Sequence, residues 1–148
     1  MLPKLHDQSI CHININSLEN KTAEIEVILM QMNVGILCVT EHKLSVLDVA
    51  TNIIKNYKCG TIQSRVSQQR QGGAAIFVKH SIEYQEIDLS KQVIDGVFEA
   101  VALNLKLYAV ICVYRPPNGC VDLFFEMLQE VVDKVSNKRK HICLSVVT

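Results

Sequence analysis

Four short polar segments stand where strands of this sequence are expected to end. Asn14 closes an alternating run, Glu41 directly follows an apolar run, Gly72-Gly73 opens another, and Tyr114-Arg115 ends a further one just before two prolines. Polar groups at strand ends are where α/β proteins collect their active sites. The guanidinium of Arg115 has the planar fork that suits two hydrogen bonds to a phosphate. The four segments are therefore candidates for one phosphate-handling site.

Each segment also has an ordinary structural interpretation. A single Asn is typical of turns and caps, and a single Glu after a strand is typical of a solvated loop. A Gly-Gly pair is typical of hairpins, and a Tyr-Arg pair before prolines is typical of surface packing. Since short motifs match by chance, the order of the segments along the chain carries more information than any one of them.

The elements that position these groups follow from the hydrophobic patterns. Residues 9–16 alternate, with apolar side chains on one face of a strand and Asn14 among the polar side chains on the other. Apolar spacing predicts helices over 22–33, 47–57 and 121–135, and strands over 34–40, 58–66, 74–80, 97–105, 107–114 and 141–147. The polar segment 67–73 is the expected hairpin loop.

The second predicted helix carries two local signals. Ser45-x-x-Asp48 resembles a capping box, with Asp in the place of the usual Glu. Leu47, Ile53 and Ile54 belong to an apolar stripe at helical spacing. We therefore expect an amphipathic helix here that buries this stripe.

The arrangement of the elements predicts the class of fold. Helices interrupt the strands instead of following them in a block, which favours a mixed sheet with helices against one face. A length of 148 residues suits one domain. The apolar fraction of 49% and the charged fraction of 20% are those of an ordinary globular protein.

The order of the segments resembles the endonuclease/exonuclease/phosphatase domain of non-LTR (LINE-type) retrotransposons. The strings that carry the resemblance are HININSLENK, ILCVTEHKL, GGAAIFVKH, FEA and AVICVYRPPN. That family reads as an Asn-containing strand, a helix, a strand ending in T-E, a Gly-Gly strand and a strand ending in Y-R-P-P-N. The resemblance covers residues 9–144. It implies an α/β (α+β) fold, a two-layer sandwich of two facing mixed sheets.

The resemblance also implies a reaction, a cofactor and a set of residues. The reaction is divalent-metal-assisted cleavage of a phosphodiester, with DNA as the partner that is nicked for reverse transcription. Asn14, Glu41 and Tyr114 would be catalytic: Asn14 hydrogen-bonds near metal and phosphate, Glu41 ligates Mg²⁺, and Tyr114 orients the scissile phosphate. To this set we add Arg115, from its residue type, as a second phosphate-binding group beside Asn14.

Two later motifs of the family do not occur in the sequence. The family continues with G-D-F-N, whose Asp activates water, and with a final S-D-H, whose His is the general base or phosphate contact. We therefore expect residues 1–148 to be a C-terminally truncated, catalytically incomplete domain that holds Mg²⁺ weakly, through Glu41 and DNA phosphates. One missing acid or base costs about 10²–10⁴-fold in rate. A sheet face left bare by the missing part would favour self-association.

Three functions stay open: an incomplete metal-dependent DNA endonuclease, a non-catalytic nucleic-acid-binding module using Asn14 and Arg115, and a functionless remnant. Equal numbers of basic and acidic residues, 15 each, argue mildly against the binding module. His12 and His42 flank the site residues, but surface or packing roles suit them better.

The cellular setting follows from the cysteines and from the apolar runs. The six cysteines form no CxxC pair, so we expect reduced thiols and an intracellular protein, cytoplasmic or nuclear. The longest purely apolar run, residues 107–114, is far shorter than the ~20 residues of a membrane-spanning helix. We therefore expect no membrane partner.

Overall fold

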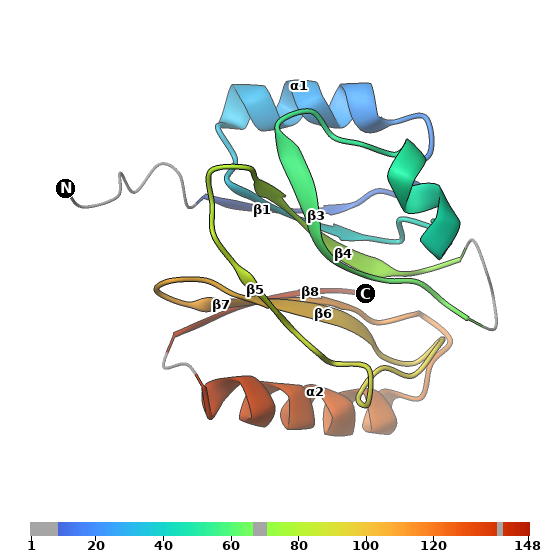
Figure 1. The fold of residues 1–148 in the computed structure, drawn as a ribbon. Helices are drawn as coiled ribbons and strands as arrows, with labels where there is room; N and C mark the ends of the chain where they lie inside the picture. The colour runs from blue at the N-terminus through green and yellow to red at the C-terminus, as the bar shows by residue number, and fades with distance from the viewer. Residues whose placement is uncertain (1–8, 67–70, 139–140) are drawn as a thin grey trace.

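The computed structural model describes residues 9–66, 71–138 and 141–148, and these form two four-stranded sheets packed face to face (Figure 1). The first sheet, in the order β1-β2-β4-β3, contains β1 (Ile10–Asn14), β2 (Ile36–Thr40), β3 (Tyr57–Gln63) and β4 (Ala74–Lys79). The second, in the order β5-β6-β7-β8, contains β5 (Gln85–Ile87), β6 (Glu99–Asn104), β7 (Ala109–Tyr114) and β8 (Ile142–Val147). The helices are α1 (Thr22–Met32), the 3₁₀ helix η2 (Val46–Thr51) and α2 (Val121–Ser136).

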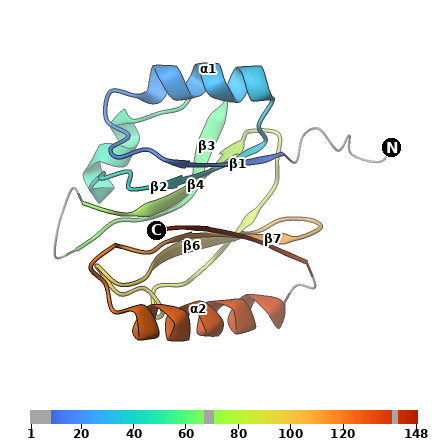
Figure 2. The same cartoon turned by 180° about the vertical axis from the view of Figure 1, so that it is seen from behind.

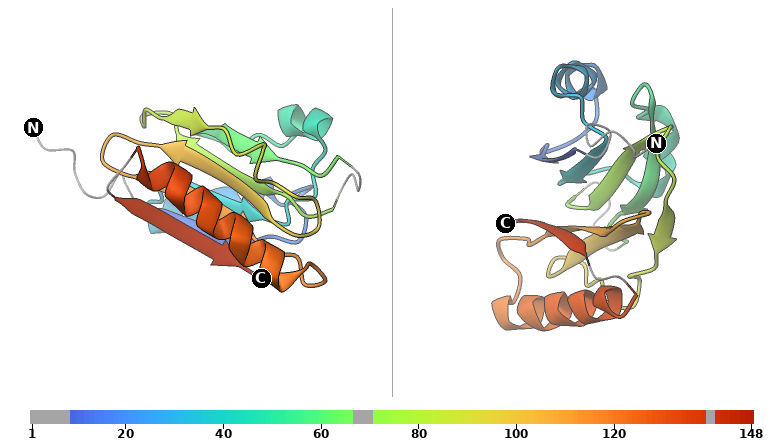
Figure 3. Two further views of the ribbon diagram at one scale, coloured as in Figure 1. Left: turned by 90° about the horizontal axis from the view of Figure 1, so that it is seen from below. Right: turned by 90° about the vertical axis from the view of Figure 1, so that its left-hand side faces the viewer.

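The two long helices lie on the outer faces of the sandwich. Figures 1 and 2 show α1 against the first sheet and α2 against the second, and the end-on view in Figure 3 shows the resulting layers. Both sheets are mixed, because β1 and β2 are parallel, β7 and β8 are parallel, and the other neighbours are antiparallel. The two facing mixed sheets that the family resemblance implied are confirmed.

Several expectations drawn from the patterns need correction. The patterns favoured one mixed sheet with helices on one face, whereas the chain builds two sheets and covers the outer face of each with one helix. The short strand β5 was missed because two of its three residues are exposed and polar, so it shows no apolar run. The predicted hairpin loop over 67–73 lies outside the described residues at positions 67–70.

The helix predicted over residues 47–57 is also different in the structure. It is a short 3₁₀ helix, η2, and Leu47 and Ile53 of the predicted stripe are exposed, whereas Ile54 is buried. With three residues per turn, a 3₁₀ helix does not bring a 3.6-residue stripe onto one face. The capping box is confirmed, since the Ser45 amide donates to Asp48 Oδ2 over 3.0 Å.

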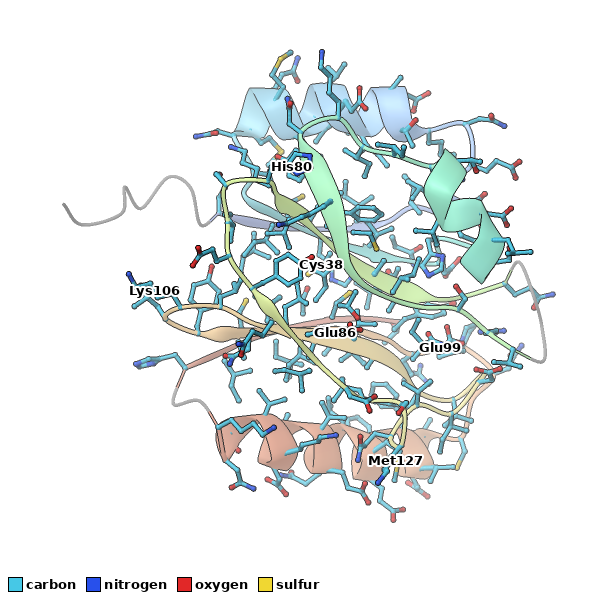
Figure 4. The ribbon with its side chains drawn as sticks, viewed as in Figure 1. Cys38, His80, Glu86, Glu99, Lys106 and Met127 are labelled. Carbon is cyan, nitrogen blue, oxygen red and sulfur yellow. The ribbon has the colours of Figure 1, made fainter. Side chains whose placement is uncertain are left out.

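Three apolar clusters hold the layers together. One lies beneath α1, one beneath α2, and the third between the two sheets, where residues such as Cys38, Ile76, Leu103 and Val110 meet. Figure 4 shows Cys38 between the sheets. The central strands β2 and β7 are buried at every residue because both of their faces are covered.

The inner face of each sheet covers that of the other, so no large apolar sheet face is bare in the described residues. The exposed apolar side chains of β8, Leu144 and Val146, lie on the outer face of this edge strand. Self-association through such a surface stays a prediction. All six cysteines are free thiols in the structure. Within the described part of the chain, no helix has the length and apolarity needed to cross a membrane.

The packing between the sheets leads to a prediction for Leu103. Its side chain is fully buried between the sheets, so Leu103→Ala should lower the free energy of unfolding by ~2–5 kcal/mol through lost transfer energy and a cavity. Leu107, in the turn between β6 and β7, is 55% exposed, and Leu107→Ala should change stability by no more than ~0.5 kcal/mol. Urea unfolding of both variants tests this, and equal losses would contradict it.

Candidate active site

The predicted site residues meet at one end of the sandwich. β1 and β2 are parallel with Asn14 opposite Thr40, so Asn14 and the following Glu41 reach the same end of the first sheet. In the second sheet, Tyr114 at the end of β7 lies opposite Glu99 at the start of β6. Figure 4 shows Glu99 at this end of the molecule and Lys106 at the opposite end.

Three of the four predicted residues are in contact through the Glu41 carboxylate. The Asn14 side-chain amide donates to Glu41 Oε1 over 3.2 Å. The Tyr114 phenol approaches the same carboxylate from the second sheet and interacts with it electrostatically. Asn14 is exposed, Glu41 is half-buried and Tyr114 is buried, so the cluster runs from the interior to solvent.

This environment keeps the Tyr114 phenol protonated. Burial raises the pKa of Tyr114 far above its ordinary value, and the interaction with the Glu41 carboxylate raises it further. The charge of Glu99 acts in the same direction, whereas that of Arg65 opposes it. Tyr114 is therefore a hydrogen-bond donor at neutral pH, not a base.

The Gly72-Gly73 segment gives the backbone of Glu41 its support. The Glu41 amide donates to the Gly73 carbonyl oxygen over 2.9 Å, and the Lys43 amide donates to that of Gly72 over 3.0 Å. Gly73 has φ +93°, and a Cβ there would lie 2.3 Å from His42 Nε2. The two glycines therefore let their backbone lie close to the segment that carries Glu41, and β4 begins directly after them.

The imidazole of His42 has a structural role. It is fully buried, Nε2 donates to the Gln63 carbonyl oxygen over 2.8 Å, and Nδ1 accepts from the Leu44 amide over 3.0 Å. These partners fix the neutral tautomer that carries its proton on Nε2. Burial lowers the pKa of His42, since the enclosed ring resists the second proton.

His12 occupies the inner face of β1, two residues before Asn14. It contacts the Thr40 hydroxyl from Nε2 over 3.2 Å and the Ser145 hydroxyl of β8 from Nδ1. Burial lowers the pKa of His12. Its bonds join the two sheets near the site, which fits the packing role favoured by the sequence.

Sequence reasoning assigned no role to the buried ion pair of Glu99 with Arg65. Glu99 is fully buried, and its Oε2 accepts from the Gly73 amide over 2.5 Å while Oε1 accepts from the Gly96 amide over 3.2 Å. The one available signal was a carboxylate inside the apolar run FEAVAL. A buried charge of this kind needs partners, but the sequence does not name them.

The fourth predicted residue, Arg115, is placed next to the cluster without joining it. Its backbone amide donates to the Val147 carbonyl oxygen over 2.8 Å. Its half-buried side chain forms no hydrogen bond or ion pair with the described residues. The phosphate-binding role of Arg115 therefore stays a prediction.

The donor groups of the cluster suit a weakly held divalent cation. No group of three or more His, Cys, Asp or Glu side chains converges in the described part of the chain. Glu41 supplies one carboxylate, and the Asn14 amide lies beside it. Because Mg²⁺ is often bound through one or two carboxylates together with substrate phosphates, this set fits Mg²⁺ that is held jointly with a ligand.

Comparisons with known proteins identify the fold. No family model and no curated protein matches the sequence. The structure is similar to the endonuclease domain of TRAS1, a telomere-specific non-LTR retrotransposon, with a TM-score of 0.67 and 15% identity over 94% of this chain and 57% of that one. The chain has the endonuclease/exonuclease/phosphatase fold.

Two further structures share this fold with the chain. The 3′ phosphatase NExo from Neisseria, bound to a product DNA hairpin, matches with a TM-score of 0.67 and 17% identity over 93% of this chain and 56% of that one. The APE2 catalytic domain of Xenopus laevis matches with a TM-score of 0.65 and 19% identity over 93% and 57%. The chain thus spans less than two thirds of the length of these structures.

The contact between Gly73 and His42 leads to a prediction with a matched control. Gly73 and Gly96 both have positive φ, +93° and +76°, but a Cβ on Gly96 would meet nothing within 4 Å. Gly96→Ala should therefore cost only the left-handed conformation, about 1–2 kcal/mol. Gly73→Ala should cost a further ~1–3 kcal/mol because its methyl group collides with the imidazole. Thermal or urea unfolding measures the difference, which must favour Gly96→Ala.

The enclosed imidazole leads to a prediction for the dependence of stability on pH. The unfolded chain protonates His42 near pH ~6.5, and the folded chain does so only at lower pH because burial lowers its pKa. The unfolded state then binds more protons, so the free energy of unfolding falls as the pH drops below ~6.5. His42→Gln should flatten this slope.

Urea unfolding of native chain and variant between pH 7 and pH 5 measures the two slopes. The control is His80→Gln, which changes an exposed imidazole and should leave the slope as it is. A native slope that persists in His42→Gln would show that other groups cause it.

Proposed function

We propose that this chain is a retrotransposon-derived domain of the metal-dependent phosphodiester hydrolase (DNA endonuclease) type, with an incomplete catalytic site. The observation that carries the proposal is the meeting of Asn14, Glu41 and Tyr114 around one carboxylate at the end of the sandwich. The likeness of the fold to the TRAS1 endonuclease domain and to DNA-bound NExo supports a nucleic acid as the substrate.

Each group of the cluster has a distinct task in the proposal. Glu41 holds a divalent cation, Mg²⁺, jointly with the DNA phosphates, and the bound cation neutralises phosphate charge. Asn14 orients the Glu41 carboxylate through one N–H of its side-chain amide and has the second N–H to donate to a phosphate oxygen. Tyr114 keeps its proton and donates to Glu41 or to a phosphate oxygen. Arg115 stands beside Tyr114 as a phosphate clamp.

Among the described residues, the buried carboxylate and the imidazole nearest to Glu41 are both already engaged, so neither is available to activate water. The Glu99 carboxylate is engaged by Arg65 and by the amides of Gly73 and Gly96. Both ring nitrogens of His42 are occupied by the backbone. Since a missing acid or base costs about 10²–10⁴-fold, nicking by this chain should be negligible.

A non-catalytic nucleic-acid-binding module is the second candidate function. It would use the same surface. One observation favours it: Asn14 is exposed, and the Arg115 side chain forms no ion pair with the described residues. The balanced overall charge means that this binding would come from local groups, with a small salt dependence. A chain that binds neither DNA nor cation would be a remnant without function.

The metal role of Glu41 can be measured with Mn²⁺ as the probe. Titration of the full chain with Mn²⁺ in the presence of a short DNA duplex, followed by water-proton relaxation, should show weak binding. Glu41→Gln should weaken it by about 10-fold or more, because the variant keeps the shape of the side chain and loses its charge. Glu126→Gln, which changes an exposed carboxylate on α2, is the control and should bind as the native chain does.

A supercoiled-plasmid assay with Mg²⁺ then tests the incompleteness of the site. The native chain and Glu41→Ala should show the same background nicking. Nicking by the native chain that disappears in Glu41→Ala would show a complete enzyme, and equal Mn²⁺ binding by native chain and Glu41→Gln would remove Glu41 as the ligand.

A further inference from the structure

We propose that Glu99 is the positioning residue of this site: it reaches from the second sheet to Gly73 of the first and, through Gly73, holds the backbone of Glu41. The consequence of this role for metal binding rests on the proposed function. The hydrogen bonds that link Glu99 to Glu41 do not depend on any activity.

Two consecutive hydrogen bonds make the connection. The Gly73 amide donates to Glu99 Oε2 over 2.5 Å. The carbonyl oxygen of the same Gly73 accepts from the Glu41 amide over 2.9 Å. One glycine thus links a buried carboxylate of β6 to the backbone of the proposed metal ligand, across the interface between the sheets.

The backbone at both ends of this connection adopts conformations that need support. Glu41 has φ +53°, a left-handed conformation that L-residues other than Gly adopt rarely. Gly73 has φ +93°, and its amide is turned into the interior toward Glu99. Such conformations persist where the surrounding contacts over-determine them. The direction of the Glu41 side chain depends on its φ, so a rotation of Gly73 would move the carboxylate away from Asn14 and Tyr114.

The Glu99 carboxylate is itself held rigidly. It is fully buried, pairs with Arg65 and accepts from the Gly96 amide over 3.2 Å in addition to Gly73. Hydrogen bonds to an ionised acceptor are stronger than neutral ones. Stability alone is a poor reason for such a group, because a buried ion pair can often be replaced by apolar residues without loss. Control of the adjoining backbone accounts for the position of this charge.

Glu99 also lies beside the second sheet's part of the site, directly opposite Tyr114 in the β6–β7 register. The same carboxylate therefore holds the backbone of Glu41 through Gly73 and neighbours Tyr114 on the adjacent strand.

Native-state hydrogen exchange of the full chain, read by NMR, tests this role without reference to activity. In Glu99→Gln, one acceptor oxygen becomes an NH₂ group, so the Gly73 amide and Arg65 compete for the remaining oxygen. Exchange of the Glu41 and Gly73 amides should accelerate by about tenfold or more relative to the Ile111 amide in the middle of β7. A purely structural Glu99 would accelerate all three alike, which would overturn the proposal.

Two further variants keep the experiment decisive. Glu86→Gln is the control, because Glu86 also accepts a hydrogen bond between the sheets, from the Thr61 hydroxyl over 2.7 Å, without contacting Gly73. It should leave the Glu41 amide unchanged. If Glu99→Gln does not fold, Glu99→Asp keeps the charge beside Arg65 and shortens the reach to Gly73, and it should give the same selective acceleration. Unchanged exchange in Glu99→Asp would also overturn the proposal.

Mn²⁺ binding in the presence of DNA separates this inference from the proposed function. Loss of an outer partner of a metal ligand typically weakens metal affinity about 10–100-fold, and we expect a loss of this size in Glu99→Gln but not in Glu86→Gln. A native chain that binds no Mn²⁺ would refute the metal role of Glu41, while the exchange rates would still decide whether Glu99 positions it. Native-like Mn²⁺ affinity in Glu99→Gln would refute the positioning of the carboxylate.

Discussion

The packing of the two apolar inner faces against each other is the constraint on which the site depends. Side chains such as Leu103 of one sheet and Ile76 of the other fill the space between the sheets, and they fix how far one sheet slides along the other. Because Glu41 belongs to the first sheet and Tyr114 to the second, their contact exists only at this one alignment. Packing energy deep in the sandwich thus sets the geometry of polar groups at its end.

On the inner faces of the sheets, the side chains change from apolar to polar toward that end of the sandwich. Along β2 and its continuation, buried Cys38 is followed by Thr40, and along β7, buried Cys112 is followed by Tyr114. At the start of β6, the charge of Glu99 stands beside apolar neighbours. The apolar interior is therefore followed, at this end of the sandwich, by a layer of polar groups that interact with one another. These interactions hold the polar groups in place before a ligand binds.

Strained backbone is concentrated around the same layer. Positive φ angles occur at Asn16 and Ser17 after β1, at Glu41 and Lys43 after β2, and at the glycine pair before β4. Backbone hydrogen bonds beyond the strand ends tie these loops together, including the Ser17 amide to the Glu41 carbonyl oxygen over 2.8 Å. The cost of these conformations is met by the contacts around them, as is common at functional sites.

Most of the secondary structure could be predicted from the sequence, because helices and strands depend on the pattern of neighbouring side chains. Alternation and apolar spacing predicted most strands and both long helices, since side-chain periodicity reports directly on which face is covered. The order of motifs along the chain pointed to Asn14, Glu41 and Tyr114, and the structure brings these three together. Arg115 was predicted from its chemistry alone, and its role stays a prediction because its side chain forms no hydrogen bond or ion pair with the described residues.

The hydrophobic patterns alone did not divide the strands into two sheets, although the family resemblance implied that division, and only the tertiary structure showed the part played by Glu99. An alternating pattern predicts that one face of a strand is buried, but it does not predict which sheet the strand joins. The same pattern therefore fits a fold with one sheet and a fold with two sheets. Arg65 follows β3 of the first sheet and lies 34 residues from Glu99, which begins β6 of the second sheet, and Gly73 and Glu99 are 26 residues apart. Their pairing depends on long-range packing that has no periodic signature, so it became visible only once the sheets were aligned.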